Sequence, residues 1–214
     1  MTSLNEIAYS VANKLGKPLD IALVNNIKFS IVNYRALFIR QDFTKNGKVH
    51  QLFVQDLGCV PLEKVDSAEC CDVESGCFVT RTEDVLPDPI RLKGLEDFTF
   101  VGAVDKITRY TSILPEEVQF IKYNKYTKND IRYYYMNRRV YILNEQKYVN
   151  IRGIFADPRD AARFNLCEGA ECYTDDSRFP IPEDMIPGII AGFVNGELQI
   201  LRETNEGKEI KADN

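Results

Sequence analysis

One long apolar stripe constrains the fold of this chain more than any other feature. It begins after Asp20, a residue type that caps helix N-termini well, and extends to Gln41. Its apolar side chains recur three or four positions apart, as on one face of an α-helix. They are Ile21, Val24, Ile27, Ile31, Tyr34 and Phe38. We therefore predict a long helix with one buried face, whose other face meets water or a partner. The residues expected there are Asn25, Lys28, Asn33, Arg35 and Arg40.

A shorter helix is predicted before it. Ser3 and Glu6 have the spacing of a capping box, in which each side chain accepts from the other residue's backbone N–H. Ile7, Val11 and Leu15 follow at helical spacing, and Gly16 ends the pattern.

Two helices are predicted near the other end. Asp157 suits an N-cap with Pro158 at the first helical position, and a last helix begins near Pro182. We expect this last helix to pack on the long one through a shared core. The candidate core residues are Ile21, Val24, Ile31, Phe38, Met185, Ile189 and Phe193.

Short β-rich runs separated by turn residues occupy the middle of the chain. The predicted strands are Val49–Gln55, Cys77–Arg81, Phe98–Val104, Ile131–Met136, Val140–Leu143 and Tyr148–Ile154. Asn137-Arg138 is the predicted turn of a hairpin. Because proline cannot donate to a sheet ladder, Asp84–Pro89 is expected to be an extended surface connection.

These elements predict an α+β fold, in which a small bundle of N- and C-terminal helices carries an inserted antiparallel β-rich subdomain. The expected parts are an N-terminal helical part (1–47), the β-rich subdomain (48–156), a C-terminal helical part (157–202) and a mobile tail or arm (203–214).

Composition excludes several classes of protein. With 44% hydrophobic and 28% charged residues the chain is an ordinary folded protein, and no apolar run is long enough for a membrane span or a signal peptide. The net charge of −5 argues against a nucleic-acid binder held by overall charge. We expect synthesis in a cytoplasm with reduced thiols.

The cysteines and the single histidine give no clear chemical motif. Neither Cys70-Cys71-x5-Cys77 nor Cys167-x4-Cys172 has the CxxC spacing of a zinc site, and Cys59 stands alone. A nucleophilic Cys70 or Cys77 with His50 as base would rest on residue types alone. No enzyme activity, cofactor or metal is therefore expected.

Residues 119–152 carry the most distinctive chemistry. Eight Lys and Arg residues stand there against Asp130 and Glu145, interleaved with seven tyrosines. Cations beside aromatic rings suit a protein interface, and they also suit a nucleic-acid-binding module or an ordinary exposed surface. The candidate interface residues are Lys122, Lys125, Arg132, Tyr134, Arg138, Arg139 and Tyr141.

Several motifs resemble a structural protein of crAss-like bacteriophages, which are short-tailed phages of gut Bacteroidales. They are Val60–Asp66, Glu69–Cys71, Gly76-Cys77, Pro89–Leu92, Phe98–Gly102, Lys122–Thr127, Arg152–Pro158 and Phe179–Pro187. The resemblance covers most of the chain.

The resemblance implies a virion protein that forms a ring in the connector between portal and tail, like the adaptors or gatekeepers of other short-tailed phages. It further implies a homo-oligomer of twelve copies that contacts the portal and other connector or tail proteins, with DNA passing through the channel. We expect the Asp84–Pro89 segment and the tail to be ordered by neighbouring rings.

Overall fold

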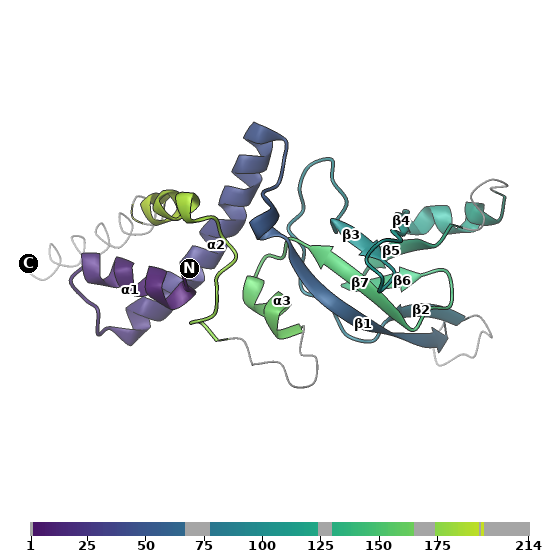
Figure 1. The fold of residues 1–214 in the computed structure, drawn as a ribbon, viewed down its shortest axis with the longest axis horizontal. Coiled ribbons are helices and arrows are strands. Elements are labelled where there is room, and N and C mark those ends of the chain that lie inside the picture. Colours follow the sequence, from purple (N-terminus) through teal and green to yellow (C-terminus); the bar gives the residue numbers. More distant parts are fainter. Residues whose placement is uncertain (1, 67–77, 124–129, 165–173, 193, 195–214) are drawn as a thin grey trace, which may run out of the picture. The chain divides into compact units, whose positions relative to one another are not determined.

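The chain folds into two units, which are described separately. The computed structural model describes residues 2–66, 78–123, 130–164, 174–192 and 194 (Figure 1). The helical unit comprises Met1–Phe53 and Tyr173–Asn214, and the sheet unit comprises Val54–Cys172. The α+β class with a β-rich insertion agrees with the sequence prediction. The unit boundaries differ from the expected 48–156 insertion at both ends.

Local capping residues determine where the first two helices begin. α1 (Leu4–Lys14) starts after Ser3, whose Oγ accepts from the Glu6 N–H at 3.1 Å while Glu6 Oε2 accepts from the Ser3 N–H at 2.9 Å. α2 (Ile21–Asn46) is capped by Asp20, and it ends at Gly47 with φ +65°. It therefore extends past the expected end at Gln41. No helix of the described residues is both long and apolar enough to cross a bilayer.

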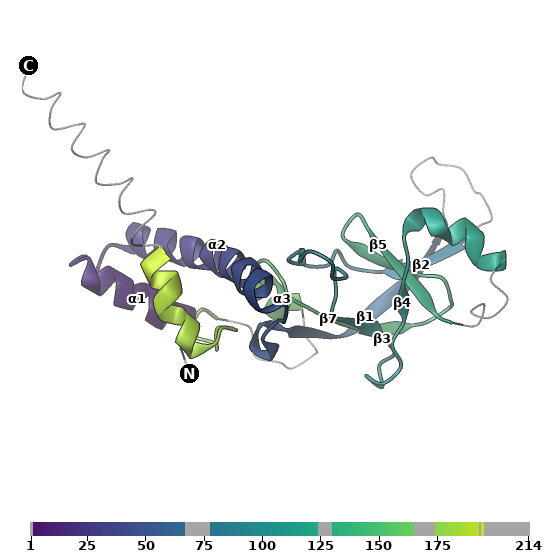
Figure 2. The ribbon, with the colours of Figure 1, turned by 90° about the horizontal axis from the view of Figure 1, so that it is seen from above.

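The core of the helical unit lies between α1, α2 and the segment that returns from the sheet unit. A 3₁₀ turn, η4 (Glu183–Met185), leads into a helix over residues 186–192. This helix lies beside α2, because a Cβ on Gly188 would be 3.0 Å from the Phe38 ring (Figure 2). The buried residues are Leu4, Ile7, Val11, Val24, Ile27, Ile31, Ile39, Phe53, Phe179, Ile181 and Ile189.

The predicted core residues behave differently from one another. Val24, Ile31 and Ile189 are buried, whereas Phe38 and Met185 are half-buried. Ile21 is 73% exposed and is not a core residue, because it lies in the first turn of α2, one turn before the buried stripe begins. Phe193 lies outside the described residues.

Arg35 corrects the predicted exposed face of α2. It is fully buried, its Nε donates to Pro180 O at 3.1 Å, and its guanidinium lies 5.7 Å from the Phe53 ring centroid and 6.0 Å from that of Phe179. Aromatic faces attract a cation, so Arg35 is the polar centre of this core. Lys28 is also turned from solvent and pairs with Asp175 at 2.8 Å.

Seven strands form the sheet unit in the order β3-β7-β1-β2-β6-β5-β4. They are β1 (Gln55–Asp66), β2 (Phe78–Thr82), β3 (Phe100–Gly102), β4 (Thr111–Ser112), β5 (Arg132–Met136), β6 (Arg139–Ile142) and β7 (Tyr148–Gly153). All neighbours are antiparallel except β4 and β5, which pair in parallel. A 3₁₀ segment, η3 (Pro115–Tyr123), follows β4.

The two ends of this strand order are hydrogen-bonded to each other. The Tyr110 N–H, just before β4, donates to Val101 O of β3 at 2.8 Å, and Gly102 and Arg109 form an antiparallel bridge. The strands therefore close around one core, as in a small barrel. Its fully buried members include Val60, Leu86, Phe98, Val101, Val140, Val149, Ile151 and Phe155.

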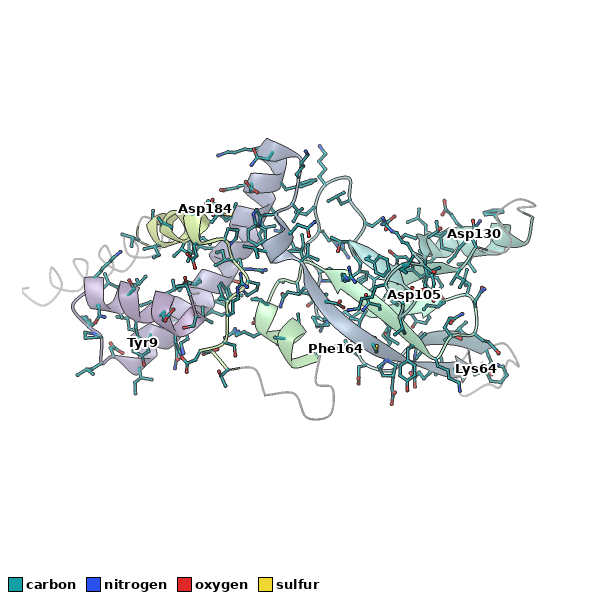
Figure 3. The ribbon with its side chains drawn as sticks, viewed as in Figure 1. Tyr9, Lys64, Asp105, Asp130, Phe164 and Asp184 are labelled. Atoms are coloured by element: carbon teal, nitrogen blue, oxygen red, sulfur yellow. The ribbon has the colours of Figure 1, made fainter. Side chains whose placement is uncertain are left out.

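Two predicted elements lie elsewhere than expected. Residues of the predicted strand Val49–Gln55 form the 3₁₀ turn η1 (Gln51–Phe53), in which the Phe53 N–H donates to His50 O and the Phe53 ring enters the helical core. α3 (Pro158–Phe164), assigned above to the C-terminal helical part, packs against β1 in the sheet unit. Figure 3 labels Phe164 at its end.

The Asp84–Pro89 segment is extended but is not a loose arm. Leu86 is buried and its N–H donates to Arg138 O at 2.8 Å, while Asp88 O accepts from the Ala156 N–H at 2.8 Å. The segment is therefore held within the sheet unit, which corrects the expectation that neighbouring rings order it. The tail beyond Glu203 lies outside the described residues.

Candidate functional site

The β5–β6 hairpin positions most of the described candidate interface residues. Asn137 and Arg138 have φ of +52° and +61°, which is the geometry of a two-residue type I′ turn. Because side chains alternate along a strand, Tyr133 and Ile142 point into the core, whereas their neighbours Tyr134 and Tyr141 lie on the outer face.

Tyr134 and Tyr141 form the centre of a row across four strands. Their rings are parallel, with centroids 4.8 Å apart. Tyr141 pairs with Arg81 of β2, and Arg81 pairs with Glu63 of β1, where Arg81 Nε lies 2.7 Å from Glu63 Oε1. We call Glu63, Arg81, Tyr134, Tyr141 and Arg138 the tyrosine–arginine surface.

Arg138 in the turn and Arg139 at the start of β6 have different environments. Arg139 is mostly buried, and its Nη1 donates to Thr82 O and Glu83 O and lies 3.3 Å from Glu63 Oε1. Arg138 is half exposed and pairs with Asp88 at 2.8 Å. Arg139 therefore braces strands of its own chain, and Arg138 is the turn arginine that a partner can reach.

The remaining candidate interface residues are half-buried or have side chains that lie outside the described residues. Arg132 is half-buried at the start of β5. Lys122 belongs to η3, but its side chain lies outside the described residues, as does all of Lys125. At the far end of β1, Lys64 Nζ lies 2.6 Å from Glu145 Oε1 (Figure 3).

The hydroxyls of Tyr133, Tyr134 and Tyr135 stay protonated, because the pKa of each is raised. Burial raises the pKa of Tyr134, and the neighbouring Tyr141 raises it further. Burial likewise raises the pKa of Tyr135, and that of Tyr133 rises through burial and the Glu96 carboxylate. Neutral phenols and paired cations suit stacking and hydrogen bonding, so the chemistry is that of an interaction surface.

A second exposed surface lies at the hairpin that joins β3 to β4. Asp105 Oδ1 accepts from the Ile107 N–H at 2.9 Å and from the Thr108 N–H at 3.1 Å, which braces a turn where Ile107 is 84% exposed. A Cβ on Gly102 would lie 2.2 Å from Thr108 O, so only glycine fits there. We call Val104, Ile107 and Tyr148 the hairpin surface. A shallow hollow of about 390 Å³ adjoins it.

Asp56 anchors this hairpin to β1. At a bulge where Gly58 has φ +72°, Asp56 Oδ1 accepts from the Gly58 N–H at 2.8 Å and from Asn150 Nδ2 at 2.9 Å. Its Oδ2 lies 2.9 Å from Lys106 Nζ and 3.2 Å from Arg152 Nε. One carboxylate therefore links β1, β7 and the hairpin.

Replacing Asp56 by asparagine is expected to lower stability in a pH-dependent way. Burial raises the pKa of Asp56, but the bonds from Lys106, Gly58 and Asn150 together hold it below the ordinary value of 3.8. A lowered pKa stabilises the fold above the unfolded-state value, and this contribution disappears as pH falls through the folded-state value. We expect Asp56→Asn to cost about 1 kcal/mol at pH 7 and progressively less below pH 3.8.

Urea unfolding at pH 7 and at lower pH measures this difference. The matched control is Asp130→Asn, because Asp130 is exposed at the loop before β5 (Figure 3). An Asp56→Asn variant whose unfolding free energy keeps a constant difference from the parent over the acid range would contradict the prediction.

Thiol and metal chemistry find little support among the described residues. Cys59 is a free thiol, and within the described ranges no three His, Cys, Asp or Glu side chains are grouped to hold a metal ion. Cys70, Cys71, Cys77, Cys167 and Cys172 lie outside those ranges. His50 is exposed and its Nδ1 accepts from the Leu52 N–H at 3.2 Å.

Sequence reasoning missed three parts of these surfaces. The Glu63–Arg81 pair requires knowing that β1 and β2 are neighbours, and the role of Asp56 requires the register of β1 on β7. Ile107 had a local signal: Asp105 before it marks a turn in which an apolar residue has no core to enter.

Comparison with known proteins assigns the chain to a family. The model of the family described as phage tail ring protein 2 matches residues 6–214. "Ring protein 2" of Bacteroides phage crAss001 is 23% identical over 206 residues, which cover 87% of this chain and 86% of the relative. Because the family match includes nearly the whole chain, this protein belongs to the phage tail ring protein 2 family and is a structural ring protein of the virion.

Proposed function

We propose that this protein forms one ring of the connector between portal and tail, and that it supports or lines the channel through which DNA leaves the capsid. The observation that carries the proposal is the match of residues 6–214 to a family of tail ring proteins. The proposed assembly is a closed ring of twelve copies, made in the host cytoplasm, whose neighbours are the portal and other connector or tail proteins.

A closed ring needs two different lateral surfaces on each copy. Identical subunits that meet head to tail use a heterologous interface, whereas a self-complementary patch would produce a closed dimer. The tyrosine–arginine surface, in which Arg138 is exposed, Tyr134 is half-buried and Tyr141 is buried, is distinct from the exposed hairpin surface of the sheet unit. We propose the first as a contact between subunits or rings, with Tyr134 and Arg138 as its accessible residues. Lys122, Lys125 and Arg132 remain candidates for the same contact on the sequence alone.

The charge balance supports passage of DNA without tight binding. Each phosphate that a cation neutralises adds affinity, and such affinity would retard DNA that moves through a channel. The whole chain carries a net charge of −5. Three described arginines of residues 119–152 have acidic partners: Arg138 pairs with Asp88, Arg139 with Glu63 and Arg152 with Asp56.

The same ion pairs weaken the case for a nucleic-acid-binding module in residues 119–152. A guanidinium that is paired with a carboxylate must leave it to bind a phosphate, so the free energy of the existing ion pair is lost. We therefore expect a dissociation constant above about 100 µM for short duplex DNA at physiological salt. Fluorescence anisotropy with a labelled duplex measures it, and submicromolar binding would favour the module.

A structure of the assembled particle tests the connector proposal directly. We expect twelve copies around the portal–tail axis, with the DNA channel at their centre. Copies on the capsid surface, or anywhere away from that axis, would contradict the proposed position even though the chain is a ring protein.

A further inference from the structure

The exposed face of α2 differs from an ordinary solvent-exposed helix face. Among residues 21–37 every exposed side chain is uncharged. The face includes Ile21, Asn25, Asn26, Phe29, Asn33 and Leu37. Phe29 is 65% exposed, and Ile21 and Leu37 are also exposed. We call these six residues the neutral α2 face.

The charged residues of this stretch are turned away from that face. Lys28 pairs with Asp175, and Arg35 is buried against Pro180 O. In a chain with 28% charged residues, a water-facing helix would normally carry Lys or Glu. Charge returns beyond the face, at Arg40 and Lys45. Depletion of charge around an exposed aromatic residue is typical of a protein interface core.

The face continues along one side of the helix. Asn25, Phe29, Asn33 and Leu37 are each four positions apart, so they follow one another along a single stripe. The stripe from Ile21 to Leu37 is about 24 Å long at 1.5 Å per residue. Its asparagines offer hydrogen bonds between the apolar residues, so it can meet a polar protein surface without unpaired charge.

We infer that the neutral α2 face is a lateral docking surface for a second copy of this chain. A basic face would be needed to hold a lipid headgroup or a phosphate backbone, and this face has no cation. The chain belongs to a ring family, and its copies each carry a net charge of −5, so they repel one another. A contact through a neutral face brings no carboxylate of that face close to the negatively charged neighbouring copy, so the contact does not increase the repulsion between copies.

The inference depends on ring membership and not on the position of the ring in the particle. Because the contact is heterologous, the neutral α2 face of one copy meets a different surface of the next copy. A ring found away from the portal would leave the docking inference intact, and failure of docking would leave the position of the ring unaffected.

Two added charges test the inference in solution. Asn26→Glu with Asn33→Glu places carboxylates within the face, and glutamate has a higher helix propensity than asparagine, so folding is not impaired. The matched control is Ser10→Glu with Gln41→Glu, which adds the same charge at exposed helix positions outside the face. Sedimentation velocity of the full chain should show association about 100-fold weaker in the first variant than in the control. Equal association of the two variants would overturn the inference.

Photocross-linking in the assembled particle identifies the occupant. With p-benzoylphenylalanine in place of Phe29, we expect adducts at twice the 24.5 kDa chain mass. Peptide mapping of the adduct then gives the counterpart surface on the neighbouring copy. Adducts solely to a different virion protein, or no adducts at all, would overturn the assignment to a second copy.

Discussion

Replacing Arg35 by alanine is expected to lower the free energy of unfolding of the helical unit by about 3–5 kcal/mol. The variant loses the hydrogen bond to Pro180 O, the cation–π contacts with Phe53 and Phe179, and most of a fully buried side chain. It leaves a cavity where α2 meets the returning C-terminal segment. Urea denaturation followed by far-ultraviolet circular dichroism measures the loss.

Two further variants separate the causes. Arg35→Met retains much of the packing but not the donor, so we expect about half of the loss. Arg40→Ala removes an exposed arginine from the same helix and should change stability by less than about 0.5 kcal/mol. If Arg35→Ala were no more destabilising than Arg40→Ala, Arg35 would not be the polar centre of this core.

Replacing Arg139 by glutamate is expected to destabilise the sheet unit by about 3–5 kcal/mol. The substitution removes the donor shared by Thr82 O and Glu83 O, and it brings a second carboxylate toward Glu63. Both effects act where β1, β2 and β6 meet. Thermal unfolding followed by near-ultraviolet tyrosine dichroism reports the change.

The neighbouring arginine provides the control. Arg138→Glu makes the same change of charge at the adjacent position of the same hairpin, but the side chains of Arg138 and Asp88 are both more than half exposed, so we expect a cost below about 1 kcal/mol. Equal destabilisation by the two substitutions would show that the turn itself, and not the bracing contacts of Arg139, carries the effect.

Features specified by nearby residues could be predicted from sequence. The Ser3–Glu6 capping box, the start of α2 at Asp20 and the hairpin turn at Asn137-Arg138 agree with the structure, because each depends on contacts within a few positions. The sequence predicts the end of α2 too early, because the apolar stripe ends at Phe38 but the helix continues to its cap at Gly47.

Features that depend on distant partners could not be predicted. Arg35 is a polar residue whose aromatic neighbours and carbonyl acceptor come from other segments, so periodicity alone predicts it on the side of the helix that meets water or a partner. The residues of α3 predict a helix, but they do not predict that this helix packs against β1, because that contact depends on the tertiary structure. The strand order requires pairings such as Leu62 with Thr82 and Val60 with Val149.

The sequence predicts which residue types form the candidate interface, but not which of them are buried or which contacts they make. The sequence marks Arg138 and Arg139 as adjacent cations of one hairpin, and their different environments follow from Glu63 and the Thr82 carbonyl on other strands. The sequence predicts Asn25 and Asn33 on a side of the long helix that meets water or a partner, together with Lys28 and Arg35, which fold away from the neutral α2 face. It predicts Ile21 in the core, whereas Ile21 belongs to that face.

Both units are completed by segments that are synthesised late, which has a consequence for biogenesis. Gln55 of β1 pairs with Gly153 of β7, and the Phe179 N–H donates to Thr2 O in the helical unit. Closing such long loops costs entropy and slows folding. A growing chain on the ribosome therefore has neither unit complete until these residues emerge. Premature termination before Gly153 would therefore leave both units incomplete.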